Sequence, residues 1–277
     1  MNILIIRACA VGDFVLNLPA LHALQVSHPD ARFILVGYPD RLEIARRFVR
    51  VASVHSIETE PWCRLFHART EIINVDHAIV WMKDPTVADN LRRSGIPSVS
   101  WFPPFPEFGH AAAHLLSTLE LPAPKLPDLW RQASNQIILH PGSGGAKKCW
   151  PHFRPLADRL EAPAFLIGPA ERDFDSGPYP RYEGLTISEV ADLISSACAF
   201  VGNDSGITHL AGYLGCPTLA LFGPTDPAVW GPIGRRIRVI QQPQLAELQV
   251  ARVVRELLSD EFSESSCGLI QASAGNQ

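Results

Sequence analysis

The first residue with the chemistry for a reaction is Asp13, which follows Gly12 soon after the apolar run Asn2–Arg7. A carboxylate at this place can take a proton from an attacking hydroxyl group. Aspartate is also a preferred helix N-cap, and spacing alone favours that structural role for Asp13, although the two roles are compatible. Gly12 and its small neighbours let backbone N–H groups come close to an anion.

A second group of such residues follows the apolar run Gln136–His140, in the stretch PGSGGAKK. The backbone at Ser143 and Gly144 and the charge of Lys148 are typical of a phosphate-binding loop. The pattern GxxxxGK[ST] is absent, so the stretch is not a Walker A loop. A glycine-rich turn with solvated lysines is the alternative.

A third group lies in the stretch GNDSGITHLA, which ends one apolar run and begins a helical pattern. Ser205 and Gly206 can offer hydroxyl and backbone donors to a diphosphate at the positive end of a helix. Asp204 would repel a phosphate if it pointed inward, so we expect it to cap or orient the loop. His209 either packs under the loop or contacts the phosphate, and both interpretations stay open.

Two further segments follow apolar runs. Glu171 comes after the run Ala164–Ile167 and could bind ribose hydroxyls, as acidic residues do in dinucleotide-binding folds. A solvated glutamate at a helix start is the safer interpretation of Glu171 alone. The stretch GPTDP, residues 223–227, is either a turn that ends a strand or part of the same site.

Short β-branched runs alternate with helical patterns along the chain, which is typical of parallel sheets covered by helices. The expected strands are 2–7, 32–37, 78–82, 96–101, 136–140, 164–167, 199–202, 218–222 and 236–240. The expected helices are 13–27, 40–48, 84–94, 110–119, 151–161, 187–197, 205–214 and 244–258. In open parallel sheets, ligands bind at the carboxyl ends of the strands, where all these motifs fall.

The proline-rich stretch LPAPKLPD, residues 121–128, interrupts this alternation and is expected to link two domains. We therefore predict an α/β protein with one Rossmann-like domain over residues 1–122 and another over residues 123–258. Residues 259–277, rich in Ser, Gly and Asn, are expected to form a flexible tail. Two such domains facing each other would leave a cleft between their parallel sheets.

Composition narrows the class of protein. The net charge of −4 gives no reason to expect a nucleic-acid partner. Six cysteines without a CxxC pair suggest no zinc site, and we expect no metal. No apolar run approaches the roughly 20 residues that span a bilayer, and no signal peptide is evident. The sequence predicts a cytoplasmic protein, for which peripheral contact with a membrane remains open.

Taken together, these stretches resemble the ADP-heptose:lipopolysaccharide heptosyltransferases of bacteria, glycosyltransferase family 9. The resemblance lies in ILIIRACAVGDFVLNLPAL, HPGSGGAKKCWPHFRPLADRL, LIGPAERD and FVGNDSGITHLAGYLGCPTLALFGPTDPAVWGP, in this order. The last stretch is the most diagnostic, and the combination is much more specific than any one element. It implies a GT-B fold, in which two Rossmann-like domains place the active site between them.

The resemblance also implies roles for individual residues. Asp13 would be the general base, and Lys148 would neutralise the leaving diphosphate together with donors at Ser205, Gly206 and the Ser143–Gly144 turn. Glu171 would hold the ribose, and the backbone near Leu185 would meet the adenine. The enzyme would be an inverting, metal-independent glycosyltransferase without a cofactor. It would move a heptose from ADP-heptose to a lipopolysaccharide core or related glycan.

The sequence departs from the family pattern in the first domain. The chain is short between residues 51 and 104, and Cys9 and Ala10 stand where hydroxyl residues are common in the family. Three alternatives therefore stay open: a different donor, a non-lipid acceptor, or a nucleotide-binding module without turnover. An NAD-dependent oxidoreductase is disfavoured because the first turn lacks GxGxxG. Sequence does not give the oligomeric state.

Overall fold

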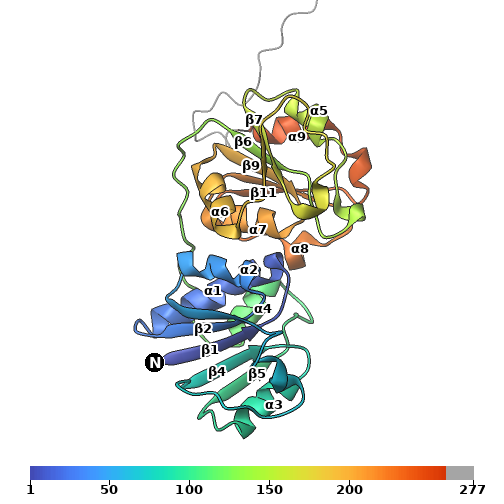
Figure 1. Ribbon diagram of the computed structural model, residues 1–277. Coiled ribbons are helices and arrows are strands. Elements are labelled where there is room, and N and C mark those ends of the chain that lie inside the picture. The colour runs from blue at the N-terminus through green and yellow to red at the C-terminus, as the bar shows by residue number, and fades with distance from the viewer. Residues whose placement is uncertain (260–277) are drawn as a thin grey trace, which may run out of the picture. The chain divides into compact units, whose positions relative to one another are not determined.

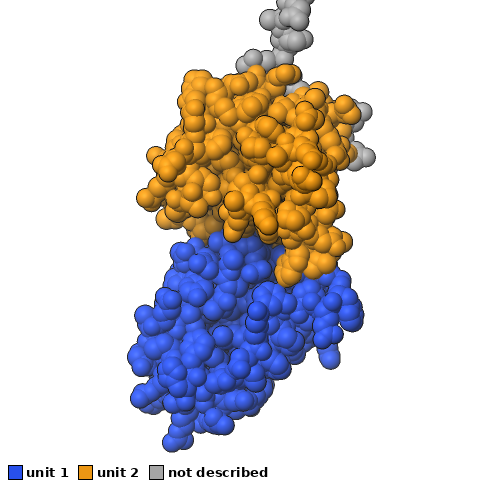
Figure 2. All heavy atoms as spheres, turned by 90° about the vertical axis from the view of Figure 1, so that its right-hand side faces the viewer, with its two compact units in different colours: residues 1–125 blue, residues 126–277 orange. Residues whose placement is uncertain are grey.

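The computed structural model describes residues 1–259 of the chain, which divides into two compact units. The first unit comprises residues 1–125 and the second residues 126–277 (Figure 2). The sequence places its domain boundary between residues 122 and 123, in the proline-rich stretch. The tail expected from residue 259 on lies, apart from Ser259, outside the described residues.

The first unit alternates strands with helices in the order that its sequence predicts. Its strands are β1 (Asn2–Arg7), β2 (Arg32–Gly37), β3 (Val51–Ser56), β4 (His77–Trp81) and β5 (Val99–Phe102). Its helices are α1 (Val11–Ser27), α2 (Pro39–Leu42), α3 (Thr86–Arg93) and α4 (Ala111–Ser117). The strands pair in parallel in the order β3-β2-β1-β4-β5, so β1 is central (Figure 1).

The second unit begins with β6 (Ile137–His140) and repeats the same alternation. Its other strands are β7 (Pro163–Ile167), β8 (Arg181–Glu183), β9 (Ala199–Asn203), β10 (Thr218–Phe222) and β11 (Ile237–Gln241). Its helices are α5 (Phe153–Ala157), α6 (Ile187–Ser196), α7 (Gly206–Leu214), α8 (Pro227–Trp230) and α9 (Val250–Leu257). The parallel order is β11-β10-β9-β6-β7-β8.

In each unit, strands are added first on one side of the unit's first strand and then on the other side. In the first unit the chain passes from β1 to β2 and β3 on one side and then to β4 and β5 on the other. In the second unit it passes from β6 to β7 and β8, and then to β9, β10 and β11 on the other side. Loops leaving two such neighbouring strands diverge, and ligands of open α/β sheets bind there. The two switch points are thus β1/β4 and β6/β9.

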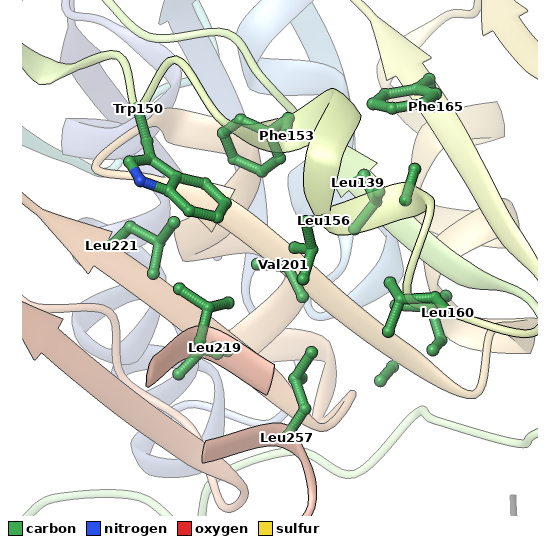
Figure 3. Close-up of a cluster of buried hydrophobic side chains, with 14 of the residues drawn as sticks. Leu139, Trp150, Phe153, Leu156, Leu160, Phe165, Val201, Leu219, Leu221 and Leu257 are labelled. Atoms are coloured by element: carbon green, nitrogen blue, oxygen red, sulfur yellow. The ribbon is translucent and has the colours of Figure 1, made fainter. Parts of the chain in front are cut away.

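Apolar residues on both faces of the central strands form the cores. In the second unit, side chains from β6, β7, β9 and β10 pack against α5 and α9 (Figure 3). Figure 3 labels Leu139, Trp150, Phe153, Leu156, Leu160, Phe165, Val201, Leu219, Leu221 and Leu257 from this cluster. Continuous apolar runs such as IIL in β6 and ILII in β1 suit strands that are covered on both faces. These cores hold the carboxyl ends of the strands rigidly.

Some elements differ from the sequence prediction. Strands β3 and β8 were not expected, because both lie at sheet edges where side chains stay partly exposed and no apolar run develops. The helix expected over residues 40–48 is α2 followed by a 3-10 turn over Glu43–Arg47. The helix expected over residues 151–161 shortens to α5.

The prediction of Asp13 as a helix N-cap is wrong. Helix α1 begins at Val11, and its N-cap is Ala10, which has extended backbone angles and makes no side-chain cap. Asp13 therefore stands in the first turn, as the third helical residue. A negative charge there still interacts favourably with the positive end of the helix.

Candidate functional site

The loop after β6 is fixed at both ends to the neighbouring strand β9. The backbone N–H of Trp150 donates to Oδ1 of Asn203 at 3.0 Å, and Nδ2 of Asn203 donates to the carbonyl of Pro141 at 2.7 Å. The indole of Trp150 is buried, and its Nε1–H donates to the carbonyl of Leu248 at 2.9 Å. One asparagine thus holds the start and the end of the loop that carries Lys148.

Asp204, directly after β9, is the centre of a buried polar cluster. Its Oδ2 accepts a hydrogen bond from Nζ of Lys148 at 2.6 Å, and its Oδ1 lies 3.7 Å from Nε2 of His209. Only 7% of the Asp204 side chain is exposed. Burial raises the pKa of Asp204, but the neighbouring side chains of His209, Lys148 and Thr225 outweigh it and lower the pKa from 3.8 to about 2. Asp204 is therefore ionised and orients Lys148.

Ser143 connects the same two loops through its side chain. Its hydroxyl donates to the backbone carbonyl of Asp204 at 2.7 Å. Because a hydroxyl has one hydrogen, Ser143 cannot donate it to a phosphate while this bond holds. The backbone N–H groups of Ser143 and Gly144 are then the donors that this turn can offer. The adjacent Gly145 has an extended backbone, and a Cβ at Gly144 would meet no other residue.

Helix α7 begins beside this cluster, with Ser205 as its N-cap. The hydroxyl oxygen of Ser205 accepts from the backbone N–H of Thr208 at 3.3 Å. The hydroxyl of Thr208 donates in turn to the carbonyl of Asn203, which shapes the entry to the helix. The first N–H groups of a helix have no partner within it and carry its positive dipole end. Half-buried Gly206 stands at this end and bears no side chain that would shield it.

The side chain of Glu171 packs against two glycines, Gly142 and Gly168, at the carboxyl ends of β6 and β7. A Cβ on Gly142 would come within 2.5 to 2.7 Å of its carboxyl atoms, and a Cβ on Gly168 within 2.7 Å of Oε2. Within residues 1–259, no hydrogen bond or ion pair engages this half-buried carboxylate. The glycines therefore make room for a carboxylate whose oxygens remain available to hydroxyl groups.

His209 and Leu185 occupy different surroundings. His209 is buried in α7 beside Asp204, and in the described part of the chain its Nδ1 has no hydrogen-bond partner. Leu185 lies half-buried in the turn between β8 and α6. Since β8 is separated from β6 by β7, Leu185 belongs to the same sheet edge but not to the Asp204 cluster.

In the first unit, Gly12 and Asp13 lie in the first turn of α1, at the carboxyl end of β1. The preceding loop is held by Arg41, whose Nη1 donates to the carbonyl of Cys9 at 2.8 Å. Burial raises the pKa of the Cys9 thiol. The charge of Asp13 raises this pKa further, and the charges of Arg7 and Arg41 lower it. Asp13 itself is half-buried.

The structure thus gathers most of the candidate residues at two sheet edges. The β6/β9 edge holds Ser143, Lys148, Asp204, Ser205, Gly206 and His209, with Glu171 next to them. Gly12 and Asp13 belong to the first unit. Sequence reasoning assigned no role to Asn203, Trp150 or Thr225. Their positions within the motifs were a signal, because each lies within two residues of a candidate or in the GPTDP stretch.

No group of three or more His, Cys, Asp or Glu side chains in residues 1–259 is placed to hold a metal ion. In the same residues, no helix has the length and apolar character that crossing a membrane requires.

Comparison with known proteins points to one family. The family model described as glycosyltransferase family 9 (heptosyltransferase) matches residues 184–256. The chain is 25% identical to lipopolysaccharide heptosyltransferase 1 of Pseudomonas aeruginosa, over 85% of this chain and 82% of that protein.

Two solved structures share the fold. An ADP-heptose lipopolysaccharide heptosyltransferase II of Escherichia coli superposes with a TM-score of 0.77 at 20% identity, covering 93% of this chain and 97% of that one. The E. coli heptosyltransferase WaaC with ADP gives a TM-score of 0.74 at 19% identity, covering 93% and 99%. The two parallel sheets are those of the GT-B fold. The chain is a glycosyltransferase related to the heptosyltransferases of glycosyltransferase family 9.

Proposed function

We propose that this chain transfers a heptose from ADP-heptose to a lipopolysaccharide core or a related glycan. The reaction is inverting and needs neither a metal ion nor a cofactor. The observation that carries the proposal is the set of groups at the carboxyl edge of the second sheet. There, Lys148 held by Asp204, the N-terminus of α7 and the unengaged carboxylate of Glu171 follow the neighbouring strands β6, β9 and β7.

These groups match the parts of a nucleoside diphosphate. The ammonium group of Lys148 and the N–H groups at Gly206 suit the two phosphates. The carboxylate of Glu171 suits a ribose, because it can accept hydrogen bonds from both vicinal hydroxyls at once. The turn at Leu185 lies farther along the same edge, where a base would follow the ribose. Adenine is favoured as the base because a similar fold holds ADP in a relative.

The transfer step uses one carboxylate and one cationic site. Asp13 takes the proton of the acceptor hydroxyl, whose oxygen forms a bond to the anomeric carbon of the sugar. The bond from that carbon to the diphosphate oxygen breaks, and attack from the opposite face inverts the configuration. The leaving diphosphate carries the electron pair away, and Lys148 and the α7 N-terminus stabilise its charge. Donor binding therefore needs only the second unit, whereas transfer needs residues of both.

The acceptor and location follow from the same proposal. A lipopolysaccharide core is favoured as the acceptor because two relatives that match most of the chain are named lipopolysaccharide heptosyltransferases. Such an acceptor would bring the chain into peripheral contact with the inner face of the cytoplasmic membrane. This location remains a prediction.

A transfer assay tests the proposal. The full chain is incubated with ADP-heptose and a lipopolysaccharide acceptor that lacks heptose, and both ADP release and the mass of the glycan product are measured. We expect ADP in a one-to-one ratio to a product heavier by one heptose, with no loss of rate in excess EDTA. Proton NMR of the product is expected to show the anomeric configuration opposite to that of the donor.

The other outcomes separate the alternatives. Turnover with UDP-, GDP- or dTDP-sugars instead would reject the ADP-linked donor but keep the transferase. Nucleotide binding without product from a panel of acceptors would support a binding module without turnover. Loss of rate in EDTA that Mg²⁺ restores would contradict metal independence.

A further inference from the structure

An arginine at the carboxyl end of β1 is buried without a countercharge. Arg7 is 3% exposed, and its guanidinium stays protonated because arginine does not lose its proton in proteins. No ion pair joins Arg7 to a carboxylate within residues 1–259. A buried charge without a partner costs several kcal/mol. The absence of a compensating group beside Arg7 therefore needs an explanation.

The protein groups around Arg7 satisfy only part of its hydrogen-bonding capacity. Its Nη1 donates to the carbonyl of Trp81 at 3.3 Å, a long bond, and Nε has no partner although it is buried. The neighbouring thiol of Cys9 supplies no charge: burial raises the pKa of Cys9 to about 12, so it is neutral near pH 7. Arg7 therefore remains an unneutralised cation.

A second cation lies on the same aromatic ring. The guanidinium carbon of Arg7 is 5.9 Å from the ring centre of Phe105, and Nζ of Lys83 is 5.2 Å from it. Lys83 is exposed, and it has no ion pair in the described part of the chain. Phe105 is 38% exposed, so solvent reaches this side of the group. Two cations without carboxylate partners thus gather on one ring, although like charges repel.

The position of the three residues makes the arrangement informative. Arg7 ends β1, Lys83 follows β4, and β1 and β4 are the neighbouring strands of the first switch point. This is where an open parallel sheet binds a ligand. Asp13 lies in the first turn of α1, the helix that follows the same strand β1.

We infer that Arg7 and Lys83, bridged by Phe105, form a binding subsite for an anionic group, a phosphate or a carboxylate, of the acceptor substrate. The anion would receive the hydrogen bond that Nε of Arg7 lacks and would be the countercharge of both cations. It would hold an acceptor hydroxyl within the region of Asp13. This inference rests on the proposed function, since it is that proposal that makes the ligand an acceptor.

The first experiment separates this subsite from the nucleotide site. The full chain is first titrated with ADP by calorimetry, which tests the second unit alone. Inorganic phosphate and, separately, acetate are then titrated into the chain saturated with ADP, or into the chain alone where ADP does not bind, with sodium chloride at matched ionic strength as the reference. Chemical shifts of the phosphate ³¹P and the acetate methyl signals report weak binding.

Three variants give the result its meaning. Lys83→Gln removes the exposed cation with little risk to folding, and Arg7→Gln removes the buried one. Arg69→Gln is the matched control, because Arg69 is an exposed arginine of the same unit outside this group. We expect saturable binding of at least one anion, weakened roughly tenfold by Lys83→Gln and unchanged by Arg69→Gln. Arg7→Gln is expected to abolish it in the folded protein.

The possible outcomes are distinct. Binding of phosphate alone identifies a phosphorylated acceptor group, and binding of acetate alone a carboxylate. Absence of saturable binding by either anion, or equal binding by wild type and Lys83→Gln, would overturn the inference. Failure to bind ADP with normal anion binding would instead count against the proposed donor. If Arg7→Gln does not fold, Lys83→Gln decides.

Discussion

The two switch points of this chain differ in whether their charged side chains are paired. At β6/β9 in the second unit, the carboxylate of Asp204 is paired with Lys148 at 2.6 Å and lies beside His209. At β1/β4 in the first unit, Arg7 and Lys83 gather on Phe105 with no carboxylate partner within the described residues. The same strand arrangement therefore carries a closed polar network in one unit and an open one in the other.

This difference shows how the two sites are prepared for ligands. The hydrogen bond from Nζ of Lys148 to the ionised carboxylate of Asp204 holds the lysine in place before a diphosphate arrives. Arg7 and Lys83 instead have no carboxylate partner within the described residues, so the anion of a ligand would be their countercharge. The family model matches only within the second unit, over residues 184–256, where the paired network lies. We interpret the second unit as a preformed donor site and the first as the part adapted to a particular acceptor.

The largest effect is expected at the carboxylate of the first unit. Asp13→Asn removes the proposed base and keeps the size of the side chain, so the rate of transfer should fall by roughly 100- to 10,000-fold. Binding of ADP, measured by calorimetry, should stay unchanged because Asp13 lies outside the second unit. Asp30→Asn is the control, since this carboxylate of the same unit is fully exposed. Transfer at the wild-type rate by Asp13→Asn would exclude the residue as the base.

The next effect concerns stability and the closed network. The pKa of Asp204 is lowered from 3.8 to about 2 in the folded chain, so its stabilisation is complete above about pH 4 and is lost as the pH falls toward 2. The shift corresponds to about 2 kcal/mol. Asp204→Asn should therefore unfold at lower urea concentration than wild type at pH 7, and the gap should narrow below pH 4.

The control for this measurement is Asp173→Asn, which changes an exposed aspartate of the same unit. It should unfold with wild type at every pH. A gap between wild type and Asp204→Asn that stays constant down to pH 3 would mean that the carboxylate is not held ionised by its partners.

A smaller effect is expected at Glu171, which distinguishes a ribose contact from general electrostatics. Wild type should bind ADP roughly tenfold more tightly than 2′-deoxy-ADP, because one hydrogen bond to the carboxylate is lost. Glu171→Gln should bind ADP more weakly and discriminate less between the two nucleotides. Glu161→Gln, an exposed change in the same unit, should keep the wild-type ratio. An unchanged ratio in Glu171→Gln would place the ribose elsewhere.

The alternation of strands and helices was predictable because buried parallel strands need continuous apolar runs. The runs over residues 2–7, 32–37 and 218–222 have the bounds of β1, β2 and β10, and the other predicted strands differ from the structure by one to three residues at an end. Strands β3 and β8 escaped because edge positions do not demand apolar residues on both faces. The early start of α1 escaped because Ala10 carries no capping side chain that would mark it.

The site was predictable in its parts but not in its pairing. Residue types and glycine-rich loops indicated Lys148, Asp204 and Glu171 separately. The Lys148–Asp204 pair joins residues 56 positions apart and depends on β6 lying beside β9. Sequence alone does not give that strand order, because β7 and β8 come between them in the chain. The unpaired state of Arg7 is likewise visible only once its neighbours are placed.

The most direct test of the account is calorimetric titration of the full chain with ADP, UDP, GDP and dTDP, repeated with Lys148→Ala and Lys147→Ala. Lys147 is the matched control, being an exposed lysine one residue from the paired one. The account predicts tightest binding of ADP, weakened roughly tenfold or more by Lys148→Ala and little by Lys147→Ala. Binding of none of the nucleotides, or equal losses in the two lysine variants, would contradict a donor site built around the Lys148–Asp204 pair.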